Sequence, residues 1–87
     1  MPRVYVPVEL REQCGGQTEL QLPGNTLREL IAAWEQQYPG VTARLCDRDG
    51  LRSGLAVSVG GVISRKGMRQ PVAEQDEVHF LPAIGGG

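Results

Sequence analysis

The sequence feature that most constrains the fold is one amphipathic helix near the middle of the chain. Five apolar residues recur at the helical period and share one face: Leu27, Leu30, Ile31, Trp34 and Tyr38. Thr26 and Glu29 have the spacing of a capping box, in which each side chain binds a backbone amide at the helix start. Pro39-Gly40 ends the helix. The stripe predicts that this helix packs against one face of a sheet.

The segments on both sides of the helix alternate apolar and polar residues, as strands do. Five segments predict strands: residues 3–8, 17–22, 55–59, 62–64 and 78–81. A turn at residues 14–17 joins the first two, and Gly60-Gly61 is typical of a two-residue hairpin. Pro7 cannot donate to a sheet ladder, which places a gap or an edge in the first strand. Pro82 ends the last strand.

Residues 41–54 form a connector with one short helical turn at 41–45 and a loop at 47–50. The predicted order is therefore strand, strand, helix, strand, short strand, strand. A hairpin that crosses by a helix to a second hairpin gives an α+β fold, with a mixed sheet of about five strands and the main helix on one face. This is the β-grasp, or ubiquitin-like, plan. We expect residues 1–82 to form one domain and residues 83–87 a flexible C-terminal tail.

Composition argues against several functional classes. The formal net charge is −1 and the basic residues form no run, so we expect no nucleic-acid partner. No apolar stretch approaches the ~20 residues that cross a bilayer. The N-terminus does not resemble a signal peptide, so we expect no membrane partner and a cytoplasmic location.

The possible metal ligands are few. Cys14, Cys46 and His79 have unrelated spacings, and we expect no metal site. The two cysteines are interpreted as small, half-buried thiols. A disulfide between them stays open, although the expected compartment disfavours it.

The residue types that catalysis requires are sparse. His79 lies in the middle of a predicted strand without a Ser or Cys at a suggestive spacing, and the acidic residues are interpreted as solvated loop charges. Pattern alone does not exclude a hydrolase with two carboxylates, but nothing favours one. There is no Gly-x-x-x-x-Gly-Lys phosphate loop. We therefore expect that the chain is not an enzyme.

The remaining candidate is the end of the sequence, Ala83-Ile84-Gly85-Gly86-Gly87. A terminal run of glycines is often a frayed tail, but this one follows a predicted strand directly. Two or three residues without side chains can thread a narrow channel and bring a carboxylate to a partner's active site. The missing Cβ of Gly87 also leaves its acyl carbon open to attack.

These features resemble the ThiS/MoaD family of sulfur carriers over essentially the whole chain. The resemblance is carried by Val8-Glu9-Leu10-Arg11-Glu12, Thr26-Leu27-Arg28-Glu29-Leu30-Ile31 and Val57-Ser58-Val59-Gly60-Gly61. It is most specific from Asp76 to Gly87, where an acidic turn, an apolar strand, a proline and a terminal diglycine follow one another. Gly86 and Gly87 match the family's diglycine, whereas Gly85 departs from the commoner small or hydroxyl residue.

The resemblance implies a protein co-substrate. A ubiquitin-activating-type adenylyltransferase would use ATP and magnesium to adenylate the carboxylate of Gly87, with Ile84, Gly85 and Gly86 threading its channel. A persulfide sulfur donor would displace AMP and leave a thiocarboxylate, whose sulfur a biosynthetic enzyme accepts. The chain itself would bind no cofactor. Its length resembles carriers for molybdopterin, cysteine or siderophore-like metabolites more than the shortest thiamin-type carriers, and the sequence does not choose among these pathways.

The resemblance also implies partner docking on the sheet face away from the helix, since alternation along the first and last strands divides their residues between two faces. The residues expected to face the core are Val4, Val6, Val8, Val78 and Phe80. The residues expected to face outward and dock partners are Tyr5, Pro7, His79 and Leu81, joined by Ile63, which corresponds to a docking position of the family. Scattered apolar surface residues are common, but this patch adjoins the tail.

Two other functions stay open from the sequence. A ubiquitin-like protein modifier would use the same activation but join Gly87 to lysines of target proteins. Lys66 is the chain's one lysine, so self-conjugation has one side-chain site, which favours the carrier. An interaction module with an idle tail would not need Gly86 and Gly87.

Overall fold

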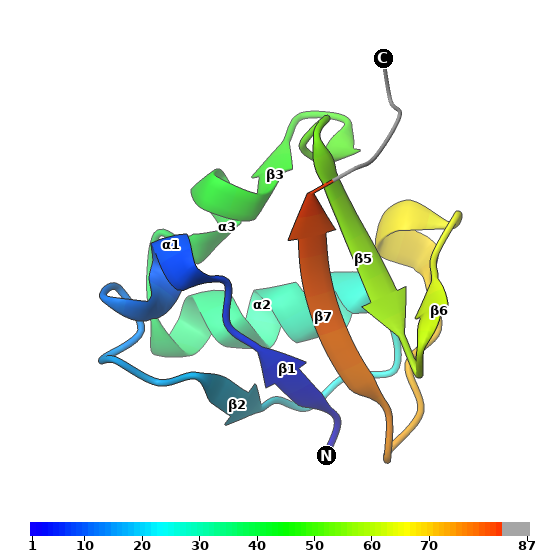
Figure 1. The fold of residues 1–87 in the computed structure, drawn as a ribbon, viewed down its shortest axis with the longest axis horizontal. Coiled ribbons are helices and arrows are strands. Elements are labelled where there is room, and N and C mark those ends of the chain that lie inside the picture. The colour runs from blue at the N-terminus through cyan, green and yellow to red at the C-terminus, as the bar shows by residue number, and fades with distance from the viewer. Residues whose placement is uncertain (83–87) are drawn as a thin grey trace.

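The computed structural model describes residues 1–82 as a mixed sheet with α2 packed against one face (Figure 1). The strands are β1 (Arg3–Tyr5), β2 (Glu19–Gln21), β3 (Cys46–Asp47), β4 (Gly50–Leu51), β5 (Leu55–Val59), β6 (Val62–Ile63) and β7 (Glu77–Pro82). The helices are α1 (Val8–Arg11), α2 (Leu27–Gln37), α3 (Val41–Leu45) and the short 3-10 helix η1 (Gly67–Arg69). Within these residues α2 is the longest helix, as the apolar stripe predicts.

The main sheet has five strands in the order β2-β1-β7-β5-β6. Its central strand, β7, pairs in parallel with β1, where Val78 lies opposite Val4. On its other side β7 pairs antiparallel with β5, where Val78 lies opposite Val59. The hairpins β1–β2 and β5–β6 complete the sheet, and α2 crosses between them. This is the β-grasp plan, and the predicted α+β fold class is confirmed.

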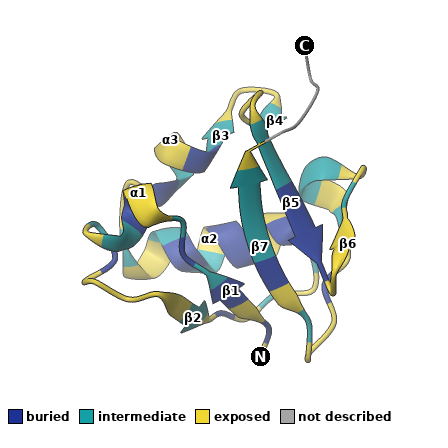
Figure 2. Cartoon of the chain, viewed as in Figure 1, coloured by how far each residue is buried: buried dark blue, intermediate teal, exposed yellow. Residues whose placement is uncertain are grey.

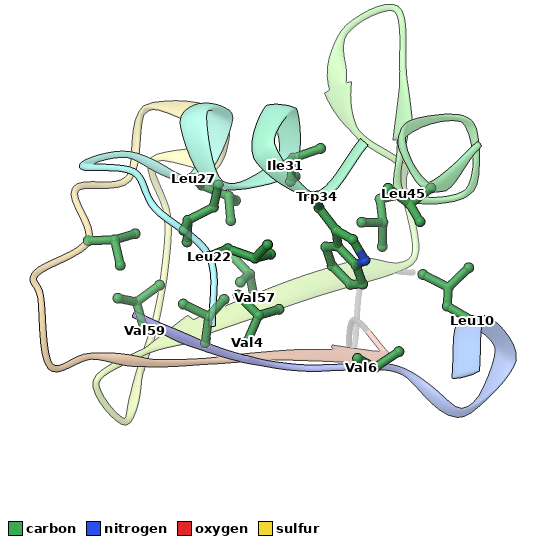
Figure 3. Packing of buried hydrophobic residues seen from close by; sticks show 14 of the residues in the cluster. Val4, Val6, Leu10, Leu22, Leu27, Ile31, Trp34, Leu45, Val57 and Val59 are labelled. Carbon is green, nitrogen blue, oxygen red and sulfur yellow. The ribbon is translucent and has the colours of Figure 1, made fainter. Parts of the chain in front are cut away.

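The core lies between α2 and the main sheet (Figure 3). The buried residues of α2 are Leu27, Leu30, Ile31 and Trp34, and the buried apolar residues of the sheet are Val4, Val57, Val59 and Val78. Trp34 points from α2 toward the sheet, and its ring centroid lies 6.0 Å from that of Phe80. Its indole N–H donates to Cys14 Sγ at 3.3 Å, so the one polar atom of this buried side chain has a partner.

The start of α2 is capped as the sequence predicts. The backbone N–H of Glu29 donates to Thr26 Oγ1 at 3.3 Å. The carboxylate of Glu29 reaches one residue further back than the box predicts and accepts from the N–H of Asn25 at 2.8 Å. The N–H of Leu27 donates to the carbonyl of Gln70 at 2.9 Å, which ties the segment after η1 to the helix start.

The first strand is shorter than predicted. Pro7 has no amide hydrogen to continue the ladder, and the chain leaves the sheet there and enters α1. Val8 begins α1 and is 68% exposed, so the prediction that it faces the core is wrong. Val4 and Val6 are buried as predicted. Figure 2 shows the buried part of β1 in dark blue.

The connector after α2 holds one more element than predicted. Its helical turn is confirmed as α3, but the residues around the predicted loop also form the separate two-stranded hairpin β3–β4. Cys46 lies opposite Leu51, and the carboxylate of Asp47 accepts from the N–H of Asp49 at 2.8 Å, which closes the turn.

Glu35 joins the end of α2 to α3. Its carboxylate accepts from the backbone N–H groups of Thr42 at 2.9 Å and Gly40 at 2.8 Å. Gly40 takes a φ of 106°, which lets the chain reverse between the two helices. The backbone hydrogen bonds, first from Thr42 and then from Gly40, lower the pKa of Glu35 below its ordinary value.

Trp34→Ala should lower the free energy of unfolding by about 3–5 kcal/mol, because it empties the centre of the core and leaves Cys14 without its donor. Urea denaturation followed by circular dichroism measures the loss. Gln36→Ala, on the exposed side of the same helix, is the matched control and should change stability by less than about 0.5 kcal/mol. Equal stability of Trp34→Ala and the parent chain would contradict this core.

Glu35→Gln should lower the midpoint of thermal unfolding at neutral pH and leave it nearly unchanged in acid. A carboxyl whose pKa is lowered by folding contributes stability above its unfolded pKa, and this contribution disappears as the pH falls through the folded value. Thermal scans at pH 7 and pH 3 measure both conditions. Glu12→Gln, which removes an exposed carboxylate, is the control. A loss of equal size at both pH values would contradict the role of the charge.

Candidate functional site

The face of the main sheet opposite α2, here called the outer face, carries residues predicted to dock partners. The register places Tyr5 opposite His79, His79 opposite Ser58, and Ser58 opposite Ile63. These four residues form one row across four strands. The rings of Tyr5 and His79 stack with their centroids 4.2 Å apart and their planes 10° apart.

A groove of about 480 Å³ lies at the carboxyl end of β7. Four of the predicted docking residues line it: Tyr5, Pro7, His79 and Leu81. Leu81 lies two residues along β7 from His79 and opposite Ala56, which places it on the outer face as well. Pro82 also lines the groove, so the groove borders the last residue that the structure describes.

Ile63 lies apart from this groove. It belongs to β6 at the edge of the main sheet, is 52% exposed, and is not a lining residue. The structure therefore places Ile63 in the row of Tyr5 and His79 but on the far side of β5. Its neighbour Val62 pairs with the core residue Val59, so Val62 belongs to the opposite face.

Sequence reasoning missed the contribution of α1. Val8, Glu9 and Arg11 line the groove together with Leu55. The signal was present, because a proline, then an acidic residue in the first turn and a basic residue in the last turn, favour a short helix. Arg11 Nε donates to the carbonyl of Val6 at 3.3 Å and holds α1 against the end of β1.

The other end of the outer face is polar. Arg3 Nε lies 3.5 Å from Glu19 Oε1, and Arg3 Nη1 lies 3.9 Å from Glu77 Oε2. A side-chain hydrogen bond with Tyr5, followed by the charge of Glu19, raises the pKa of Arg3. Glu77 Oε1 also lies 3.5 Å from His79 Nε2. Exposed pairs of this kind add little stability, and they mark where the apolar part of the face ends.

The predicted reactive tail lies outside the described residues: Ile84, Gly85, Gly86 and Gly87. The structure describes the strand that leads to it. β7 pairs with β1 as far as His79 and with β5 as far as Pro82. The sequence up to Pro82 is thus held in the sheet beside the groove.

The two cysteines occupy different environments, and both are free thiols. Cys14 is fully buried against Trp34. Cys46 is half-buried, and its pKa is raised by burial and by the charge of Asp47, against an opposing effect of Arg28. A raised pKa leaves less of the reactive thiolate at neutral pH.

Residues 1–82 hold neither a metal-binding cluster nor a helix that could span a membrane. These residues place no three His, Cys, Asp or Glu side chains where they could share a metal ion. None of the helices in this part of the chain is long and apolar enough to cross a membrane.

Comparison with known proteins identifies the family. The profile of the ThiS family matches residues 4–87, a range that includes every residue predicted for the reactive tail and for docking. The chain belongs to the ThiS family. The resemblance inferred from the sequence is therefore confirmed.

Individual proteins similar to this chain agree with the family and with the fold. The sulfur carrier protein CysO of Mycobacterium tuberculosis is 32% identical to this ThiS-family chain, covering 97% of it and 96% of CysO. A chain of the Amycolatopsis orientalis BexX/CysO complex is 30% identical, with a TM-score of 0.90 and full coverage of both chains. The small archaeal modifier protein SAMP1 of Methanosarcina acetivorans has a TM-score of 0.76 at 23% identity, covering 99% of this chain and 95% of its own, which supports the fold alone.

Thiol reactivity provides a test of these environments. With a chromogenic disulfide reagent at neutral pH, Cys46 should react more slowly than it does in the urea-unfolded chain, because burial disfavours its thiolate. Cys14 should react only when the protein unfolds. The variants Cys14→Ala and Cys46→Ala assign the two phases. Two thiols that react in the folded chain as fast as in the unfolded chain would contradict the described packing.

Proposed function

We propose that this chain is a sulfur carrier of the CysO type and that Gly87 is the residue that carries the sulfur. One observation supports this most directly: the ThiS profile matches residues 4–87, which include both the folded body and the tail, and similarity to a sulfur carrier runs along 97% of the chain. A groove lies beside the end of β7, where we propose that partners dock. In this proposal the protein is a co-substrate that other enzymes load and unload.

The proposed chemistry begins at the carboxylate of Gly87. An oxygen of this carboxylate attacks the α-phosphorus of ATP with magnesium in an activating enzyme, and pyrophosphate leaves. The terminal sulfur of a persulfide then attacks the acyl carbon, and AMP leaves. A thiol reduces the resulting sulfur–sulfur bond and frees Gly87 as a thiocarboxylate, a nucleophile that a sulfur-accepting biosynthetic enzyme consumes.

The proposal assigns partner docking to the outer face. Tyr5, Pro7, His79 and Leu81 line one groove, and Ile63 extends the surface across the sheet. A partner seated there lies beside Pro82, after which Ile84, Gly85 and Gly86 would lead into its active site. The pairing of β7 supports this role, because it holds the strand beside the groove as far as Pro82.

Intact-mass spectrometry tests the proposal. The purified chain is incubated with a ubiquitin-activating-type adenylyltransferase from the same source, ATP, magnesium and a persulfide donor. A carrier gains the mass difference between one sulfur and one oxygen atom, and treatment with an alkylating reagent labels the new thiocarboxylate. Deletion of Gly86 and Gly87 removes the acceptor and is the control.

The same experiment separates the alternatives. Covalent adducts of Gly87 with lysines of added proteins, without a thiocarboxylate, would replace the carrier by a protein modifier. An unchanged mass with an activating enzyme that loads another carrier would contradict the proposal.

Leu81→Glu should weaken binding to the activating enzyme by about tenfold or more, because it replaces an apolar lining residue of the groove beside Pro82 with a charged one. Isothermal titration calorimetry measures the affinity, and circular dichroism checks that the fold is kept. Val62→Glu introduces the same charge at a 68% exposed position on the opposite face and should leave the affinity unchanged. Equal affinities for the two variants would remove the outer face as the docking surface.

A further inference from the structure

A second hollow, of about 790 Å³, lies on the helix side of the molecule. It is bounded by the start of α2, the β3–β4 hairpin and the segment around η1, which contact one another. Figure 1 shows α2 behind the sheet and the yellow η1 segment beside β6. None of the residues that line this hollow also lines the groove of the outer face. The two concave surfaces are therefore separate.

The lining of this hollow gathers most of the chain's positive charge. Five of the nine basic residues line it: Arg28, Arg48, Arg65, Lys66 and Arg69. Only two of the ten acidic residues, Asp47 and Asp49, do so. The lining side chains thus carry a formal charge of +3, whereas all other side chains together carry −4. A chain of nearly neutral total charge has one strongly positive surface.

These five cations are not used to stabilise the described fold. All five side chains are exposed, and within residues 1–82 none forms an ion pair with a carboxylate. The grouping of these cations is a feature of the fold, because backbone hydrogen bonds hold the η1 segment, which carries three of them. In η1 the N–H of Arg69 donates to the carbonyl of Lys66 at 3.2 Å, and the N–H of Gln70 to that of Gly67 at 3.0 Å.

The floor of the hollow is apolar. Leu51 and Met68 line the hollow and also pack against the hydrophobic core. Each is therefore half-buried, covered by the core on one side and open to the hollow on the other. Cys46 lies there too, close enough to Arg28 for the guanidinium to act on its pKa. An apolar floor with a cationic rim accommodates a segment that has both apolar and acidic side chains.

We propose that this hollow docks an acidic polypeptide segment of a partner protein. The five cations come from three separate parts of the chain and all are exposed, which matches the spaced carboxylates of an extended acidic segment. The rim carboxylates of Asp47 and Asp49 fit a peptide that also has a basic residue. Since the hollow and the outer-face groove share no residue, one partner can hold the chain here while the outer face remains available.

A synthetic glutamate decapeptide is a probe for this surface. Titrated into the ¹⁵N-labelled full chain at low ionic strength, it should shift the amide resonances of residues 46–51 and 65–69 and leave those of the outer face unchanged. The double variant Arg65→Gln/Arg69→Gln should bind about tenfold more weakly, since each exposed ion pair contributes a modest share. Arg44→Gln/Arg52→Gln removes the same charge outside the hollow and should bind within about twofold of the parent chain.

Three outcomes would overturn this proposal. The first is equal weakening by the two double variants, which would mean that net charge alone attracts the peptide. The second is a set of shifts centred on the outer face. The third is inorganic pyrophosphate displacing the peptide at far lower concentration than the peptide itself binds, which would make the hollow a phosphate site. None of these results depends on loading of Gly87, so they leave the proposed function untouched.

Discussion

The placement of β7 is the constraint on which the rest of the structure depends. This strand is the centre of the main sheet, and its residue Val78 packs between Val4 of β1 and Val59 of β5. The parallel pairing with β1 closes the longest loop of the fold, and the buried stripe of α2 covers the junction from one side. Because β7 is held on both edges, the groove on the outer face at its carboxyl end is bordered by residues fixed in the sheet, up to Pro82. The core and the groove thus share one strand.

Local patterns in the sequence predict most of this fold. The helical stripe, the capping box at Thr26 and the turn at Gly60-Gly61 are each decided by neighbours within a few residues, and the structure contains all three. The sequence predictions fail where a backbone constraint or a nonlocal contact overrides the local pattern. Val8 continues an alternating pattern, but Pro7 ends the ladder one residue earlier and turns the chain into α1. The β3–β4 hairpin is too short for a periodic signal to reveal it.

The candidate site divides in the same way. Alternation along β1 and β7 places Tyr5, His79 and Leu81 on one face, and the structure gathers them around one groove. The basic hollow has no comparable signature, because its cations are separated by up to forty-one positions in the sequence and meet only when η1 and the β3–β4 hairpin pack beside α2. A chain without a basic run can still have a basic surface. The family match adds what neither pattern nor geometry supplies, namely the family to which residues 4–87 belong.

In the proposed function the reaction takes place at one free carboxylate, that of Gly87, and the rest of the protein positions this group in its partners. Semisynthesis can place an amide on Gly87 while leaving the folded body unaltered, so the two contributions can be separated. The measurement is ATP–pyrophosphate exchange catalysed by the activating enzyme, with the free-acid and the amidated chain as substrates. The account predicts exchange with the free acid alone, and tight binding of both forms through the outer face. Equal exchange with the amidated chain would contradict the claim that Gly87 is the group that is activated.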